Sequence, residues 1–102
     1  MTTSITRFPL PPGIPREAIK AGFLAVAPKF KQPSGLLRKY FLLSEDGKTG
    51  GGVYLWKSIE EARDFSEGVL RQMIKDKFHV DPSIEYYESP VIVDNVTSEI
   101  IA

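Results

Sequence analysis

Two apolar runs separated by a short polar segment dominate the middle of the chain. The runs are Leu36–Leu43 and Val53–Trp56, and the polar segment Ser44–Thr49 lies between them. An Asp-Gly pair, Asp46 and Gly47, stands at the centre of that segment, and this dipeptide is a strong hairpin turn signal. The pattern therefore predicts two paired antiparallel strands.

Neither run alternates between apolar and polar residues. In a regular first strand both faces are largely apolar, one with Leu37, Lys39, Phe41 and Leu43 and the other with Leu36, Arg38, Tyr40 and Leu42. The second strand likewise has Val53 and Leu55 on one face and Tyr54 and Trp56 on the other. An antiparallel sheet with one face in water shows clean alternation, so this sheet must be covered on both faces.

Two further strands are expected, one near each end of the chain. Ser4–Leu10 is a short apolar segment that stops at a Pro-Pro-Gly sequence, which cannot continue a strand. Ile84–Val93 has apolar residues on both faces, and Pro90 removes a donor within it, so this strand lies at a sheet edge or bulges there. The tail Asp94–Ala102 is either an arm over a neighbouring molecule or a loosely held end.

A first helix is predicted from Pro15, because proline is preorganised for the first helical turn. The apolar residues that follow recur at helical spacing and form one stripe of Ile19, Phe23, Val26, Ala27 and Phe30. Pro28 cannot donate to the Leu24 carbonyl, so the helix should kink or end near Ala27. Such an end either opens space for a ligand beside the sheet or simply tapers off.

A second helix is predicted after Trp56. Ser58 and Glu61 have the spacing of a capping box, which satisfies free N–H groups at a helix start. The apolar stripe behind them is Ile59, Ala62, Phe65, Val69, Leu70, Met73, Ile74 and Phe78, and the helix should stop at Asp81. Gly68 within the stripe marks either a break between two shorter helices or a close approach to the sheet.

The expected order is strand, helix, strand, strand, helix, strand. That order predicts a single α+β domain over residues 1–102, with a ferredoxin-like βαββαβ fold and both helices on one face of a four-stranded antiparallel sheet. Two helices cover only one face, and the apolar area left on the other exceeds what a monomer usually exposes. We therefore expect a homodimer in which two sheets pack face to face.

The composition limits the classes of partner. Thirteen basic residues balance thirteen acidic ones, so no net charge draws the chain to nucleic acid or to an anionic membrane. The chain has no cysteine, which excludes disulfides, thiolate metal sites and a cysteine nucleophile. Met1–Arg7 lacks the apolar core of a signal peptide and no stretch is long enough to span a bilayer, so we expect a cytoplasmic protein.

Two strings in the central hairpin carry a resemblance to a known family. They are Ser34–Tyr40 (SGLLRKY) and Gly51–Trp56 (GGVYLW), followed by a helix rich in Glu and Ala. In these strings and in element order the chain resembles small mono-oxygenases of the dimeric α/β-barrel superfamily, which are relatives of the antibiotic-biosynthesis mono-oxygenases. The string match spans about Pro33–Phe65, whereas the element order extends over most of the chain.

The resemblance implies a homodimer with a mostly apolar pocket between the helices and the sheet of each subunit. Better-known relatives oxidise aromatic polyketides with oxygen and without metal or flavin, others degrade haem, and many have no demonstrated reaction. The resemblance transfers no catalytic residue to the chain.

The candidate substrate-binding residues are aromatic and come from three strands and one helix: Trp56, Tyr40, Tyr54, Tyr86 and Phe23, with Phe41 beside them. Such rings could line a pocket for a flat ligand, although aromatic residues at strand spacing also serve as core or interface. Trp56 is the leading candidate, because it ends a strand at the expected rim of the pocket.

Two residues are candidates for catalysis. His79 is the only histidine and could act as the base that forms an electron-rich substrate anion, or it could simply occupy a helix end. Arg38 stands on an otherwise apolar strand, where it could hold an acidic or enolate group or pair with a carboxylate such as Glu88. No arrangement of residues has metal-ligand spacing.

The sequence thus favours a cofactor-independent mono-oxygenase that acts on a small aromatic or apolar molecule in a desolvated pocket. The alternative is a non-catalytic homodimer that binds or senses a metabolite, which the scarcity of catalytic residue types favours. A third possibility is a dimer that binds a protein partner through the barrel rim and its terminal residues Ile100 and Ile101.

Overall fold

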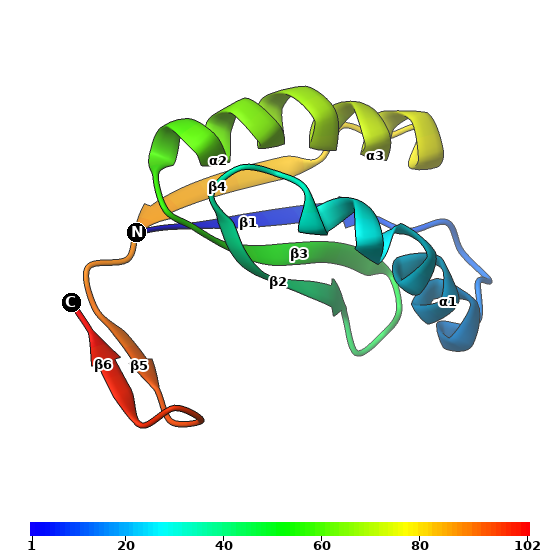
Figure 1. Cartoon of the computed structure of the whole chain (residues 1–102). Helices are drawn as coiled ribbons and strands as arrows, with labels where there is room; N and C mark the ends of the chain where they lie inside the picture. Colours follow the sequence, from blue (N-terminus) through cyan, green and yellow to red (C-terminus); the bar gives the residue numbers. More distant parts are fainter.

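The computed structural model describes residues 1–102 and has one layer of helices over one sheet (Figure 1). Its elements in chain order are β1 (Thr2–Pro9), α1 (Arg16–Val26), the 3-10 helix η1 (Ala27–Lys31), β2 (Leu36–Leu43), β3 (Thr49–Trp56), α2 (Ile59–Phe65), the π-helical turn η2 (Ser66–Leu70), α3 (Arg71–Phe78), β4 (Ser83–Glu88), β5 (Ile92–Asp94) and β6 (Glu99–Ile101).

The main sheet is antiparallel and has the strand order β2-β3-β1-β4. Strand β1 is therefore central, and its proline, Pro9, is its last residue. The α1–η1 segment and the α2–η2–α3 segment lie on the same side of this sheet (Figure 1). This arrangement confirms the predicted α+β, ferredoxin-like βαββαβ fold.

A β-bulge in β2 decides which of its side chains face the helices. The register against β3 shifts between Leu36 and Arg38, so Leu37 is the extra residue. Leu36 therefore shares the helix-covered face with Lys39, Phe41 and Leu43, where a regular strand would have placed Leu37. The prediction of a regular strand was therefore wrong for Leu36 and Leu37.

The opposite side of the sheet, here called the open face, is covered by no helix. Residues that are paired across strands share a face, and the larger side chains on this one are Ile5, Tyr40, Leu42, Val53, Leu55 and Tyr87. Tyr40 and Tyr87 are 53% and 51% exposed. Both faces of the sheet are thus apolar, as the sequence predicts.

The core lies between the helices and the other face. Its buried apolar residues are Phe8, Leu10, Ile19, Tyr54, Trp56, Ala62, Leu70 and Ile74. Trp56 is fully buried, and its indole Nε1 donates a hydrogen bond to Ser4 Oγ on β1 (3.0 Å). Because a buried indole N–H needs a partner, Ser4 allows the largest side chain of the core to pack without an unsatisfied donor.

The first helix ends where proline predicts. Helix α1 stops at Val26, and Pro28 lies in the first turn of η1, where a missing N–H costs no helical hydrogen bond. The tighter turn then carries Phe30 toward the sheet, so that its ring meets the rings of Phe41 and Tyr54.

The second helix begins at its predicted cap and contains an unexpected π turn. Ser58 Oγ accepts from the Glu61 backbone N–H (3.2 Å), which confirms the capping residue. The buried residues along the helix are four apart, at Ala62, Ser66, Leu70 and Ile74. Four residues advance an α-helix by about 40° more than one turn. The π turn has more residues per turn, so it offsets part of this rotation of the buried positions around the helix axis.

The π turn changes two predictions for this helix. Val69 is 56% exposed and does not belong to the buried stripe. Gly68 is exposed, and a Cβ added there would have no neighbouring atom within 4 Å, so this glycine marks the division between α2 and α3 and no close approach to the sheet. π turns are uncommon and are hard to identify from residue type.

The last expected strand, Ile84–Val93, is interrupted. Strand β4 ends at Glu88 on the sheet edge, and β5 pairs only with β6 in a separate hairpin. Figure 1 shows this hairpin extending away from the sheet at the end of the chain. Pro90 lies in the break, because it cannot donate to a ladder.

Glycines of β3 allow β1 and β3 to pack closely. A Cβ on Gly51 would overlap the backbone oxygen of Thr6 on β1, and one on Gly52 would lie 2.9 Å from the Tyr54 ring. The first contact involves backbone, which cannot move without separating paired strands. The Gly-rich start of β3 is therefore a requirement of the sheet.

We expect Gly51→Ala to lower the free energy of unfolding by at least about 2 kcal/mol, because the added methyl forces β1 and β3 apart. The matched control is Gly68→Ala, whose methyl enters open space and should be neutral or stabilising by up to about 1 kcal/mol. Urea denaturation of both variants measures the difference, and equal losses would contradict this account of β3.

Candidate functional site

An apolar cavity of about 70 Å³ lies between the helices and the sheet. Its lining comes from α1, η1, η2 and α3 on one side and from β1, β2 and β3 on the other, and the side chains are Phe8, Phe23, Val26, Phe30, Lys39, Phe41, Tyr54, Leu70, Met73, Ile74, Lys77 and Phe78. An apolar space with few polar groups is the usual form of a small-molecule site.

A second space of about 110 Å³ adjoins the first beneath α1. The two share Phe23, Lys77 and Phe78, so they form neighbouring parts of one apolar region between α1 and α3. An apolar protein cavity of about 150 Å³ accommodates benzene. The combined space therefore suits a single ring or a short chain, and a tricyclic ligand is larger than it.

Lys39 of β2 is a polar group that lines the first of these spaces. Its Nζ lies 3.2 Å from the ring centroid of Phe30, 3.8 Å from that of Phe41 and 4.7 Å from that of Tyr54. None of the ion pairs in the structure includes Lys39. Lys39 is half-buried, and its amine lies against three aromatic faces with no carboxylate beside it.

Burial lowers the pKa of Lys39 to about 7, because the charged form loses its water shell. The ring faces act in the opposite direction, since they attract the ammonium through the π quadrupole. The net effect of this surrounding is an amine that is unprotonated in a substantial fraction of molecules near neutral pH. Such a group can take a proton or attack an electrophile.

Two other titratable groups lie at the cavity. Tyr54 is almost fully buried, and this burial raises the pKa of its phenol, so the hydroxyl stays neutral. Lys77 of α3 lines both spaces, and its Nζ would lie 3.6 Å from a Cβ on Gly22 of α1. The cavity thus contains no carboxylate and no histidine, and Lys39 is its most buried amine.

Two of the predicted substrate-binding residues line the cavity. Tyr54 forms part of the sheet side, and Phe23 of α1 stacks on Phe41 of β2 with ring centroids 4.9 Å apart. Phe41, which the sequence places beside them, also lines it.

Trp56 does not line the cavity. Its ring is enclosed by the core, with Tyr54 at 6.2 Å and Phe65 at 5.8 Å between centroids, and its N–H is already bonded to Ser4. Residues Tyr54 and Trp56 lie on the same face of β3, but only Tyr54 is near enough to α3 and η1 to border the space. The expectation that a strand-end tryptophan lies at the rim does not hold, because α2 covers this end of β3.

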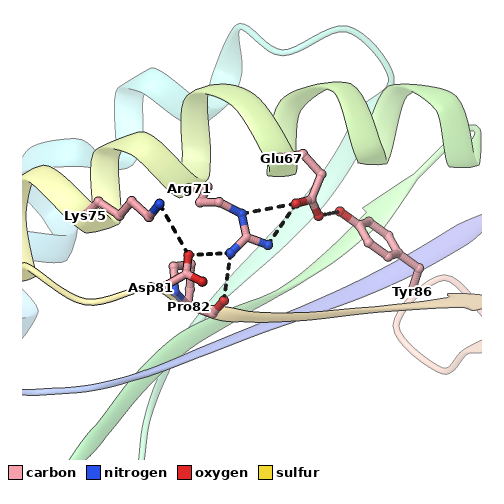
Figure 2. A network of polar contacts seen from close by, with 6 residues as sticks. All are labelled: Glu67, Arg71, Lys75, Asp81, Pro82 and Tyr86. Atoms are coloured by element: carbon pink, nitrogen blue, oxygen red, sulfur yellow. Dashed lines mark hydrogen bonds and ion pairs between the residues drawn. The ribbon is translucent and has the colours of Figure 1, made fainter.

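Tyr86 lies outside the cavity, in a polar network that joins η2 and α3 to β4 (Figure 2). Its hydroxyl donates to Glu67 Oε2 (2.7 Å), and Glu67 Oε1 accepts from Arg71 (2.8 Å), which also donates to Asp81 (2.6 Å) and to the Pro82 carbonyl (3.1 Å). Burial, together with the Glu67 carboxylate, raises the pKa of Tyr86 to about 12. This network positions the helix over β4.

Tyr40 and Arg38 lie on the open face, away from the cavity. The Arg38 guanidinium donates to the Tyr40 hydroxyl (3.1 Å) and lies 3.8 Å from the Asp94 carboxylate of β5. Of the two roles predicted for Arg38, the structure thus shows pairing with a carboxylate. The partner is Asp94 and not Glu88.

His79 is also remote from the cavity. It follows α3 in the left-handed region with φ of 58°, its backbone N–H donates to the Lys75 carbonyl (2.9 Å), and its side chain is exposed. A non-glycine residue in this conformation is uncommon and here serves as a helix C-cap. The structure places neither of the two predicted catalytic residues beside the cavity.

Lys39 is the functional candidate that sequence reasoning missed. Its signal is a single cationic residue on a strand face whose other members, Phe41 and Leu43, are apolar. An amine at such a position lies in solvent if its face of the sheet is open, and among apolar side chains if the helices cover that face. Only the three-dimensional arrangement shows that Phe30 closes over it.

The structure contains no group of three or more His, Cys, Asp or Glu residues that could hold a metal ion. None of its helices has the length and apolar character needed to cross a membrane.

Solved structures share this fold. A mono-oxygenase from Streptomyces coelicolor, crystallised with the ligand nanaomycin D, matches with a TM-score of 0.63 and 19% identity over 86% of this chain and 86% of that one. A cofactor-independent oxygenase from Streptomyces nogalater matches with a TM-score of 0.61 and 16% identity over 86% and 91%. A protein of unknown function from Nitrosomonas europaea matches with a TM-score of 0.63 and 22% identity over 86% and 87%.

No family model and no curated protein matches the sequence. Antibiotic-biosynthesis mono-oxygenases are among the solved structures that share the fold, so the predicted resemblance is confirmed at the level of the fold. Identities of this size show a shared fold, whereas activity is argued from the site.

We expect Lys39→Met to stabilise the protein at acidic and neutral pH. The folded pKa is about 7, and the unfolded value is about 10.4, so the cost of burying the cation is complete below pH 7 and fades as pH rises toward about 10.4. The variant should exceed the wild type by about 1–3 kcal/mol in unfolding free energy near pH 6, after allowance for the ring contacts.

Urea denaturation across this pH range measures the difference between variant and wild type. The difference should shrink toward zero near pH 10, while the exposed control Lys29→Met should show no such trend. A wild type that is more stable than Lys39→Met at all pH values would contradict the buried-amine account.

Proposed function

We propose that this protein is a homodimer that binds a small aromatic or apolar molecule in the Lys39 cavity and oxidises it with O₂, without metal or flavin. The observation that carries the proposal is an apolar cavity lined by an amine whose pKa is near neutrality. An oxygenase from Streptomyces nogalater that works without a cofactor shares the fold, which supports the same class of chemistry here.

The proposed reaction needs one base and an apolar enclosure. The unprotonated amine of Lys39 removes a proton from an activated CH₂ or phenol of the substrate, and the resulting anion is electron-rich enough to combine with O₂. A hydroperoxide forms at that carbon, and loss of water leaves C=O where CH₂ stood. The Lys39 ammonium returns its proton to the peroxide oxygen when the hydroperoxide forms, and the amine then takes the second proton of that carbon and passes it to the departing hydroxide. The substrate supplies all the electrons that O₂ accepts.

This assignment replaces His79 and Arg38 as the base or anion-holding group. Both lie away from the cavity, whereas Lys39 lies among the rings that would contact a flat substrate. The ligand-contacting residues in the proposal are Phe23, Phe30, Phe41 and Tyr54.

The second copy in the proposal covers the open face. Ile5, Val53 and Leu55 form its centre, with the rings of Tyr40 and Tyr87 at either side. Contiguous apolar area of this kind is commonly an interface, and a two-fold axis lets one sheet cover the other. The β5–β6 hairpin supports the same assembly, because its paired Val93 and Ile100 are 63% and 75% exposed.

The alternative function is a dimer that binds a metabolite without turnover. The cavity contains neither a histidine nor a carboxylate, and this favours the alternative. Ligand binding and oxygen consumption separate the two functions, since a binder shifts the melting temperature and consumes no oxygen.

We expect Leu55→Asp to convert the dimer into a monomer, because a carboxylate at the centre of the open face cannot be buried against another sheet. Light scattering after size exclusion measures the mass. Val69→Asp, on the exposed side of the helix layer, is the matched control and should stay dimeric. A wild type that is monomeric at micromolar concentration would contradict the proposed assembly.

We expect oxygen uptake with a hydroquinone of one ring, whereas a tricyclic anthrone, which is larger than the cavity, should give none. Lys39→Met should reduce the rate at least about 100-fold, as removal of a general base does. Lys29→Met should retain it. Oxygen uptake that survives in Lys39→Met would contradict the role of Lys39, and ligand-induced melting shifts without uptake would favour the binding function.

A further inference from the structure

The Lys39 cavity has the properties of a site that captures carbonyl compounds. The half-buried amine has no ion-pair partner, it lines an apolar space of about 70 Å³ between helices and sheet, and three ring faces lie against it. A lysine that is desolvated in an apolar pocket is a nucleophile at neutral pH, because its lone pair is available. These observations do not depend on oxygen chemistry.

We infer that Lys39 forms a reversible Schiff base with a small apolar aldehyde or ketone. The amine nitrogen attacks the carbonyl carbon and gives a carbinolamine, which loses water to leave a C=N bond between the ligand carbon and Nζ. The nitrogen contributes two hydrogens and the ligand contributes its oxygen to that water. No atom is oxidised or reduced, so no co-reactant is needed.

The surroundings favour the product in two ways. The protonated imine is a cation at the position of the amine, where the faces of Phe30, Phe41 and Tyr54 attract positive charge. The apolar lining keeps the concentration of water low, and this opposes hydrolysis of the C=N bond. The ring faces attract the free ammonium as well, whereas the exclusion of water acts on the adduct alone.

The lining also selects the class of carbonyl compound. The cavity presents rings and aliphatic groups, and its titratable neighbours are the Tyr54 hydroxyl of β3 and the Lys77 amine of α3. No carboxylate is present to bind a hydroxyl-rich sugar. An aldehyde with one ring, such as benzaldehyde, therefore matches the space better than a polar aldehyde of similar size such as glyceraldehyde.

The test is reductive trapping under anaerobic conditions at about pH 7. Wild-type protein is incubated with benzaldehyde and sodium cyanoborohydride, and peptide mapping by mass spectrometry locates the benzyl group. We expect Lys39 to be labelled at least about 10-fold faster than any other lysine, since an ordinary lysine is almost fully protonated at this pH. Mapping also separates Lys39 from the α-amino group, which competes near neutral pH.

Three comparisons make the result decisive. Lys39→Arg should abolish the fast label and keep the fold, and Lys29→Arg should leave it unchanged. Glyceraldehyde should show no preference for Lys39. Labelling spread over the exposed lysines, or concentrated on Lys77, would overturn the inference. The trapping reaction needs no oxygen, so it is independent of the oxygen-uptake assay of the proposed function. Fast labelling of Lys39 in the first experiment, with no uptake in the second, would reject the oxygenase and retain the carbonyl site.

Discussion

The pairing of β2 with β3 determines what enters the cavity. The bulge at Leu37 sets Lys39 directly opposite Tyr54 on the helix-covered face, and a one-residue slip would move it to the open face. Phe41 pairs with Gly52 in the same ladder, and the missing side chain at Gly52 gives the Tyr54 ring its place. The register thus brings a cation and aromatic rings together beneath α1, η1 and α3.

Partial burial of the Lys39 amine lowers the stability of the fold, and packing does not require an amine at this position. Leucine or methionine at position 39 would fill the same apolar space without the loss of hydration that lysine suffers. Attraction to three ring faces offsets part of the hydration free energy that the ammonium loses. No carboxylate lies beside the amine to offset the rest. Perturbed ionisable groups in apolar cavities are concentrated at functional sites, and this makes Lys39 a stronger candidate than any aromatic residue of the cavity.

The fold was predictable because its signals are local. Asp46-Gly47 sets the hairpin, Ser58 starts a helix and Pro28 ends one, and each acts through its own backbone chemistry. The site was less predictable because it depends on packing between distant segments. Residues Trp56 and Tyr54 are equivalent in sequence pattern, yet α2 covers one and leaves the other beside the cavity. The bulge at Leu37 has no comparable local signal, and Gly68 indicates a break in the second helix without predicting that the break is a π turn.

The charge state of Lys39 tests this account most directly. Selective ¹³C labelling of lysine Cε allows the protonation of each amine to be followed by NMR across the pH range of the folded protein, with Lys39→Met to assign the signal. The account predicts a Lys39 midpoint near pH 7. A midpoint above about pH 10, as in an exposed lysine, would contradict it.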